Sequence, residues 1–267
     1  ASFATVKAVQ APLSISLAGT LNYDPTTPAT ANVALTGGSG SGTVSYVASG
    51  PCTLSSQSAS GAVVTATGGG TCSVTVSKAT DTNYLAATAF TSFSIGTATQ
   101  APLNVTVGSL AMTYRATPAA TTSVSTSGGS GSGAISYLVS PTSSSVCSIV
   151  SAADGLGTLT ALSAGTCTFT AVKAADNDFS VAASTPTSVT VYAAVTTSVV
   201  TASLDLTYGV AMTATAPVVA YGGYGVTYSA TLPAGLAINS STGVISGTPS
   251  AAGLPTNFSV TATDLNG

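Results

Sequence analysis

The chain repeats itself, and this duplication limits the fold more than any other feature of the sequence. The segment QAPL at 10–13 returns at 100–103, and the run GGSGSG at 37–42 returns at 128–133. Each run is followed by a strand-like stretch and then by two cysteines. The period is about 90 to 95 residues, which is the length of one small domain. A solenoid rung of roughly 20 to 30 residues does not fit this period.

A third, more divergent copy follows the first two. The stretch GGYGVTY at 222–228 takes the place of the glycine-rich run and its tyrosine, and FSVT at 258–261 takes the place of CSVT at 72–75. This copy has no cysteine, and apolar residues such as Leu236 and Phe258 stand near the cysteine positions.

Within each repeat the local pattern predicts β-structure. Short alternating runs rich in Val, Thr, Ile and Tyr, such as 13–17, 72–76 and 187–191, are separated by Gly, Pro, Asn and Asp. No sustained helical period is present. About seven short strands in about 90 residues is the count expected for an immunoglobulin-like (Ig-like) sandwich. We therefore predict an all-β chain of three tandem Ig-like β-sandwiches, the third lacking its last strand.

The N-terminal segment resembles a final strand, and the third repeat at the C-terminal end lacks one. ASFATVKAVQAPL at 1–13 matches TSFSIGTATQAPL at 91–103 in Ser, Phe, Ala and the whole QAPL, at an offset of 90. Because 91–97 should form the final strand of the first repeat, residues 1–9 resemble a final strand without its repeat. The third repeat stops nine residues after Phe258. The predicted domains are an orphan terminal strand at 1–9 and repeats at 10–98, 99–193 and 194–267.

An Ig-like sandwich without its last strand leaves an unpaired sheet edge, to which a strand from another chain can be added. One hypothesis is that the N-terminal strand of one copy completes the third domain of the next, which gives a head-to-tail filament. The other is that a longer array has been cut out of frame with its repeats, so that flanking Ig-like repeats are the partners. The candidate donor residues are Ser2, Phe3, Thr5 and Val6, and the candidate acceptor residues are Phe258, Val260 and Ala262.

The four cysteines form two pairs with the same spacing, Cys52 with Cys72 and Cys147 with Cys167. Four cysteines allow three connectivities, and the duplication of a pair inside a repeat favours one disulfide per domain. Disulfides imply an oxidising compartment, such as the periplasm or the cell exterior. Two thiols per domain without histidine do not make a tetrahedral zinc site, so no metal is predicted.

The composition excludes several classes of protein. Charged residues make up 4% of the chain, and there is no His, Glu or Trp. Four scattered cations do not supply the basic surface that nucleic acid requires. No catalytic base or dyad is recognisable, so we predict neither an enzyme nor a cofactor. No apolar run is long enough to span a membrane as a helix.

Three further motifs have simple explanations. The glycine-rich runs lack the Lys-Ser/Thr of a phosphate loop and are expected to be turns between strands. Asp81 and Asp176 occupy equivalent positions, where turn formation explains them more simply than calcium binding. Asparagine triplets at 104, 239 and 257 leave a glycan possible.

The third repeat resembles a known family. LPAGLAINSSTGVISGTPSAAG at 232–253, followed by NFSVTATD at 257–264, is similar to the Putative Ig domain family of large bacterial adhesins. The first two repeats look like other bacterial Ig-like repeats. The resemblance implies extracellular, tandemly arrayed, non-catalytic modules and transfers no binding residue.

Two function classes follow. The first is an extracellular structural subunit of a bacterial surface filament, stalk or sheath, secreted or held at the cell surface. The second is an adhesive or carbohydrate-binding segment of a large surface protein. Aromatic residues are only 6% of the chain and fall mostly at repeat positions, which favours the structural class.

Overall fold

The computed structural model describes residues 4–253 and 256–265. Strands dominate this part of the chain, and its helical structure is confined to two 3-10 turns, η1 (Pro141–Ser143) and η2 (Ala153–Gly155). The predicted all-β class is confirmed.

The chain divides into two compact units. The first consists of Ala1–Pro102 together with the loops Gly128–Gly133 and Lys173–Ala182, and the second contains the rest. The second and third sandwiches thus share one unit. The repeat boundaries given above remain a prediction.

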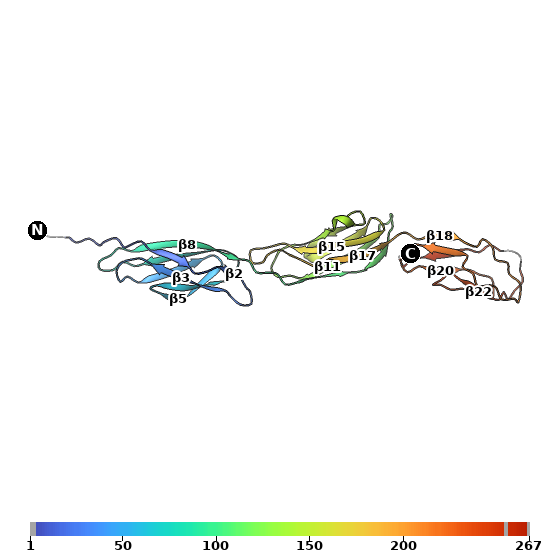
Figure 1. Ribbon diagram of the computed structural model, residues 1–267, viewed down its shortest axis with the longest axis horizontal. Helices are drawn as coiled ribbons and strands as arrows, with labels where there is room; N and C mark the ends of the chain where they lie inside the picture. The colour runs from blue at the N-terminus through green and yellow to red at the C-terminus, as the bar shows by residue number, and fades with distance from the viewer. Residues whose placement is uncertain (1–3, 254–255, 266–267) are drawn as a thin grey trace. The chain divides into compact units, whose positions relative to one another are not determined.

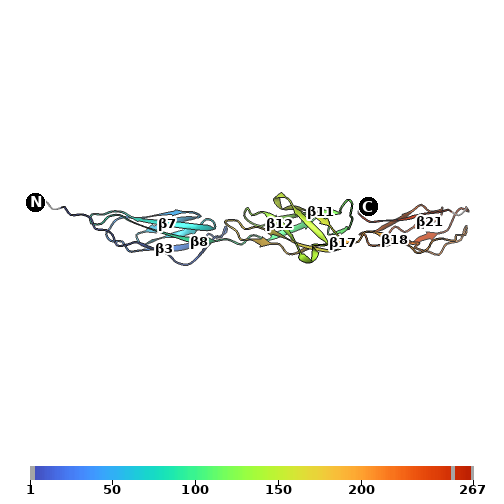
Figure 2. The ribbon, with the colours of Figure 1, turned by 90° about the horizontal axis from the view of Figure 1, so that it is seen from above.

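The first sandwich has two sheets, with strand orders β1-β3-β6-β5 and β2-β8-β7-β4. This is the arrangement of an Ig-like sandwich, with the short β2 added parallel to the last strand, β8. Figure 1 labels β3 and β5 of the first sheet and β2 and β8 of the second. Figure 2 shows β7 and β8 side by side, in agreement with their long antiparallel pairing. The strands are β1 (Ser14–Leu17), β2 (Leu21–Asn22), β3 (Thr30–Thr36), β4 (Val44–Ser49), β5 (Cys52–Ser58), β6 (Gly61–Ala66), β7 (Gly70–Lys78) and β8 (Ala87–Gly96).

Alternation along the strands builds the core of this sandwich. In β6 every second side chain is buried, because neighbouring residues of a strand point to opposite faces. Val64 of β6 meets Val74 and Val76 of β7 in one apolar cluster, so the two sheets share a core. Burying each such valine stabilises the fold by about 1.5 to 3 kcal/mol.

The second sandwich repeats this arrangement. Its sheets have the orders β13-β14-β11-β9 and β10-β17-β15-β12, and β10 runs parallel to the last strand, β17. The strands are β9 (Leu103–Val107), β10 (Ala111–Thr113), β11 (Thr121–Gly128), β12 (Ile135–Val139), β13 (Cys147–Ser151), β14 (Leu156–Ala161), β15 (Gly165–Lys173), β16 (Ala182–Ala183) and β17 (Thr187–Tyr192).

The third repeat consists of three two-stranded sheets, β18-β19, β20-β23 and β21-β22. A bridge between Thr215 and Ile245 connects its strands further, and Ile245 is fully buried. The strands are β18 (Thr196–Val199), β19 (Val218–Tyr221), β20 (Thr227–Ala230), β21 (Leu236–Ile238), β22 (Ile245–Gly247) and β23 (Val260–Thr263).

A disulfide connects the two sheets of each complete sandwich. Cys52 at the start of β5 bonds to Cys72 in β7, and Cys147 at the start of β13 bonds to Cys167 in β15. The Cα atoms are 5.8 and 5.7 Å apart. These are the pairs that the repeat predicts, and they use all four cysteines of the chain.

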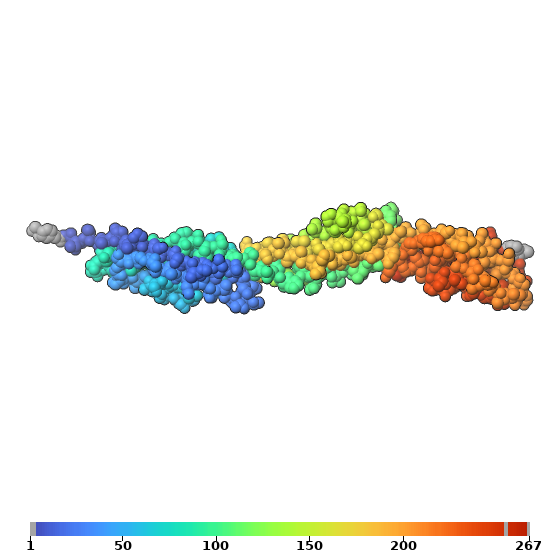
Figure 3. Space-filling view, in the orientation of Figure 1, coloured from blue at the N-terminus to red at the C-terminus, as the bar shows by residue number. Residues whose placement is uncertain are grey.

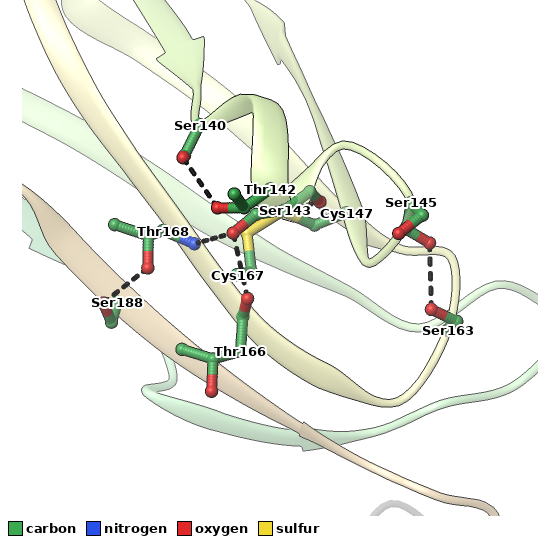
Figure 4. The surroundings of a disulfide bond; sticks show 10 residues. All are labelled: Ser140, Thr142, Ser143, Ser145, Cys147, Ser163, Thr166, Cys167, Thr168 and Ser188. Atoms are coloured by element: carbon green, nitrogen blue, oxygen red, sulfur yellow. Dashed lines mark hydrogen bonds between the residues drawn. A yellow bond between two sulfur atoms is a disulfide. The ribbon is translucent and has the colours of Figure 1, made fainter.

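Hydroxyl groups surround the second disulfide (Figure 4). Ser143 of η1 donates its hydroxyl proton to the carbonyl of Thr166, at 3.0 Å, and accepts the N–H of Thr168, at 3.1 Å. This buried serine therefore fastens η1 to both sides of Cys167 in β15.

Replacing Cys147 and Cys167 by alanine should destabilise the second sandwich by about 3 kcal/mol, because the bond closes a loop with a sequence separation of 20. Hydrogen exchange followed by mass spectrometry should show faster exchange in β14. Exchange in β6, which lies in the other unit, serves as the control. Unchanged exchange in β14 would contradict the structural role given to this bond.

Candidate functional site

In the first two repeats, an aspartate from a later loop accepts a hydrogen bond from the backbone of the glycine-rich run. The carboxylate of Asp81 accepts the N–H of Ser41, at 2.6 Å, and the N–H groups of Asn83 and Tyr84, both at 2.8 Å. The same carboxylate thus shapes its own turn and holds the loop of residues 37–42. The predicted Asx-type turn is confirmed, and it has this second partner in addition.

The glycine opposite the carboxylate leaves room for it. Gly40 has a φ of +76°, and a Cβ at this position would lie 2.0 Å from Oδ2 of Asp81. No other residue type fits without moving the loop or the aspartate. The carboxylate of Asp81 therefore explains why a glycine stands at position 40, without a phosphate.

The second repeat has the same arrangement, in which an aspartate carboxylate holds the glycine-rich run; we call this contact the latch. Asp176 accepts hydrogen bonds from the backbone of Ser132, Phe179 and Asp178. These bonds stabilise the ionised carboxylate, the one from Ser132 most, and lower the pKa of Asp176 from 3.8 to about 2. The pKa of Asp81 is lowered as well, first by the bonds from Asn83 and Tyr84.

The segment before the first sandwich lies along one of its loops. The N–H of Ala8 donates to the carbonyl of Asn83, at 2.8 Å, and the N–H of Leu85 donates to the carbonyl of Ala8, at 2.9 Å. The side chain of Gln10 donates to the carbonyl of Leu85, at 2.8 Å. Residues 8–10 are thus held by their own first sandwich.

The segment before the second sandwich makes the same contacts. The N–H of Ala98 donates to the carbonyl of Asp178, at 2.8 Å, and the N–H of Ser180 donates to the carbonyl of Ala98, at 2.9 Å. Gln100 donates to the carbonyl of Ser180, at 2.8 Å. The recurring QAPL is therefore an anchor of the segment that enters each sandwich.

The predicted donor segment is only partly described. Thr5 and Val6 lie outside any strand, and the side chain of Val6 is 91% exposed. Ser2 and Phe3 lie outside the described residues. Figure 3 shows the first described residues, in dark blue, projecting from the body of the first sandwich.

The predicted acceptor strand has one partner in the described part of the chain. β23 pairs with β20 alone, whereas β7 pairs with both β4 and β8, and β15 with both β12 and β17. Val260 and Ala262 lie in β23 and are half-buried, and Phe258 lies two residues before the strand. One edge of β23 therefore has no strand beside it among these residues.

β23 begins later than the alignment with β7 would place it. The residues of β7 before Ser73 pair only with β8, because the pairing of β7 with β4 begins at Ser73. By the alignment of 72–75 with 258–261, residues 256–258 of the third repeat are the counterparts of 70–72. These residues are not in a strand, and their counterparts in β7 pair with the last strand of the first sandwich alone.

Sequence reasoning located the recurring QAPL, the aspartates and the glycine-rich runs but missed how they are joined. The signal for the latch was present, since Asp81 and Asp176 recur in register with the runs. The parallel pairing of β2 with β8 had no signal, because two residues are too short for a pattern.

The strand order and the disulfides define a chain of tandem Ig-like β-sandwiches. Residues 170–267 match the family described as Putative Ig domain. This match covers the third repeat and the last strands of the second, and it confirms the resemblance seen in the sequence of the third repeat. No curated protein matches the chain.

Three solved structures illustrate the similarity. An I-band fragment of titin has a TM-score of 0.46 and 15% identity, covering 97% of this chain and 95% of that chain. InvD of Yersinia pseudotuberculosis has a TM-score of 0.34 and 15% identity, covering 94% and 82%. Domains 4 and 5 of the S-layer protein SbsC have a TM-score of 0.24 and 16% identity, covering 69% and 99%.

Residues 4–253 and 256–265 contain neither a helix that could span a membrane nor a cluster of metal ligands. No helix there has the length and apolar character to cross a membrane. No group of three or more His, Cys, Asp or Glu residues comes together there as a set of metal ligands.

The latch of Asp176 predicts acid sensitivity. The pKa of this group is lower in the folded chain than its ordinary value of 3.8, so its stabilising effect is complete above that value and is lost as the pH falls toward about 2. The melting temperature should decrease over this interval, and Asp176→Asn should make the decrease smaller. Asp154→Asn, which removes a charge at an exposed turn, is the control. An unchanged pH profile in Asp176→Asn would contradict the latch.

Proposed function

We propose that this chain is an extracellular structural subunit of a bacterial surface filament, stalk or sheath built from Ig-like modules. Copies join head to tail, and residues 1–6 of one copy complete the third sandwich of the next. The observation that supports this most is the late start of β23. Residues 256–258, which lie before β23, align with 70–72 of β7, and these three residues pair with the last strand alone.

The repeat alignment predicts the register of the added strand. In the first sandwich Val74 lies opposite Thr91, and Cys72 lies opposite Phe93. The equivalent pairs between copies place Ala1 opposite Val260 and Phe3 opposite Phe258. The segment of residues 1–5 thereby covers 256–259, which lie in no strand, and the free edge of Val260 at the start of β23.

The same alignment predicts which side chains enter the sandwich. In β8, Phe93 packs against the first core, and Ile95 is buried in it, whereas Ser92 is exposed. Phe3 and Thr5 hold the places of Phe93 and Ile95, and Ser2 holds the place of Ser92. In the proposed assembly Phe3 therefore points into the third sandwich and Ser2 points to solvent.

Two further features are consistent with an extracellular polymer. Both disulfides require an oxidising compartment for their formation. The chain has a formal net charge of −3 over 267 residues, so charge repulsion between neighbouring copies is weak. A contact between two different surfaces does not close on itself in general, and it gives a filament.

Sedimentation velocity over a concentration series tests the proposal. The unmodified chain should form species larger than one copy, and Phe3→Asp should weaken the association by roughly 100-fold, because it places an unpaired charge in the sandwich interior. Ser2→Asp adds the same charge one residue away, on the outward face, and should leave association intact.

Two results would contradict the proposal. The first is that the unmodified chain remains a single copy at all concentrations. The second is that the Phe3→Asp and Ser2→Asp variants associate equally well. Neither position belongs to the predicted repeats at 10–98, 99–193 and 194–267, so far-ultraviolet circular dichroism should show unchanged folding in each variant.

A further inference from the structure

The first compact unit contains an occupied docking site. The loop of residues 173–182 contacts the end of the first sandwich there, and the carboxylate of Asp178 accepts the N–H of Gly69, at 2.8 Å. The ring of Phe179 meets the ring of Tyr23 edge-on, with centroids 5.9 Å apart at an angle of 78°. Only 8% of Phe179 is exposed. An aromatic pair of this geometry adds about 0.5 to 1.5 kcal/mol to the effect of burial.

The first repeat carries the same loop, which no other repeat covers among the described residues. SKATDTNY at 77–84 aligns with VKAADNDF at 172–179, so Asn83 and Tyr84 hold the places of Asp178 and Phe179. The backbone contacts of Ala8 with this loop reproduce those of Ala98. Tyr84 is half-buried and Asn83 is exposed, in contrast to the buried Phe179.

The third repeat carries the counterpart of Tyr23. LNY at 21–23 aligns with LTY at 206–208, and both follow the first strand of their repeat, β1 or β18. Tyr208 is 65% exposed. This end of the third repeat thus offers an aromatic ring at the position that, in the first repeat, contacts the next loop.

The last strand of a sandwich connects the position of this tyrosine with the anchor of the segment that follows. The N–H of Tyr23 donates to the carbonyl of Gly96 at the end of β8, at 2.8 Å, so this strand ends at the backbone of Tyr23. Val6 holds the place of Gly96 in the alignment at an offset of 90. A donated strand that ends at Val6 would therefore end beside Tyr208 and would continue directly into the anchor at Ala8.

We infer that the loop of residues 81–85 is a docking site for a second copy of this chain, which covers it with the end of its third repeat that carries Tyr208. The ring of Tyr208 packs against the ring of Tyr84 as Tyr23 packs against Phe179. The inference rests on the proposed head-to-tail assembly and adds to it a second contact between copies, separate from the strand.

Crosslinking between two variants tests this contact. Tyr84→Cys and Tyr208→Cys are prepared separately as full chains, each with one free thiol in addition to the native disulfides, then mixed and treated with a short bismaleimide. A product with the mass of two chains is expected from the mixture. Neither variant alone should give it. Val150→Cys, at a position 69% exposed on β13, replaces Tyr208→Cys in the control mixture and should give at least 10-fold less product.

Sedimentation of the same mixtures distinguishes the possible failures. Association without the Tyr84–Tyr208 product overturns the docking site and leaves strand donation in place. Absence of association overturns the proposed function and the docking site with it. Equal product from the Val150→Cys control shows unspecific collision and also overturns the docking site.

Discussion

The strand with the second cysteine holds each complete sandwich together. β7 pairs along one edge with β4 and along the other with β8, and its Cys72 bonds to the opposite sheet. β15 has the same three connections. Their counterpart in the third repeat, β23, has neither a cysteine nor a second neighbour in the described residues. The stretch before it, at 256–259, is correspondingly not in a strand.

Local patterns were sufficient to predict the fold class. Alternation as in 72–76 predicts strands, and the duplicated spacing of Cys52 and Cys72 predicts the disulfide. Contacts between distant segments were harder to predict. The hydrogen bond from Ser41 to Asp81 depends on how two loops meet at one end of the sandwich. A linear sequence carries no signal for such a meeting beyond the recurrence of both loops.

The role of the segments that precede the first and second sandwiches was equally hard to predict from sequence. QAPL was visible as a repeated word, but its role depends on Gln10 and Gln100 reaching the carbonyls of Leu85 and Ser180. The contact of Gln10 with Leu85 also shortens the part of the N-terminal segment that can act as a donor strand. Residues 8–10 are held by the first sandwich, so in the proposed assembly the donated strand ends before this anchor. In the register proposed above, residues 1–5 of this strand lie opposite 256–260 of the next copy.

Hydrogen exchange at 256–260 tests the central claim most directly. A peptide with the sequence of residues 1–9 is added to the full-length Phe3→Asp variant, whose own segment should not bind. The account predicts slower amide exchange at 256–260, with little change in β7 or β15, whose edges are already paired. A peptide with Phe3 replaced by Asp should have no effect. Unchanged exchange at 256–260 at saturating peptide, or slower exchange only elsewhere, would contradict the claim that the third sandwich accepts this strand.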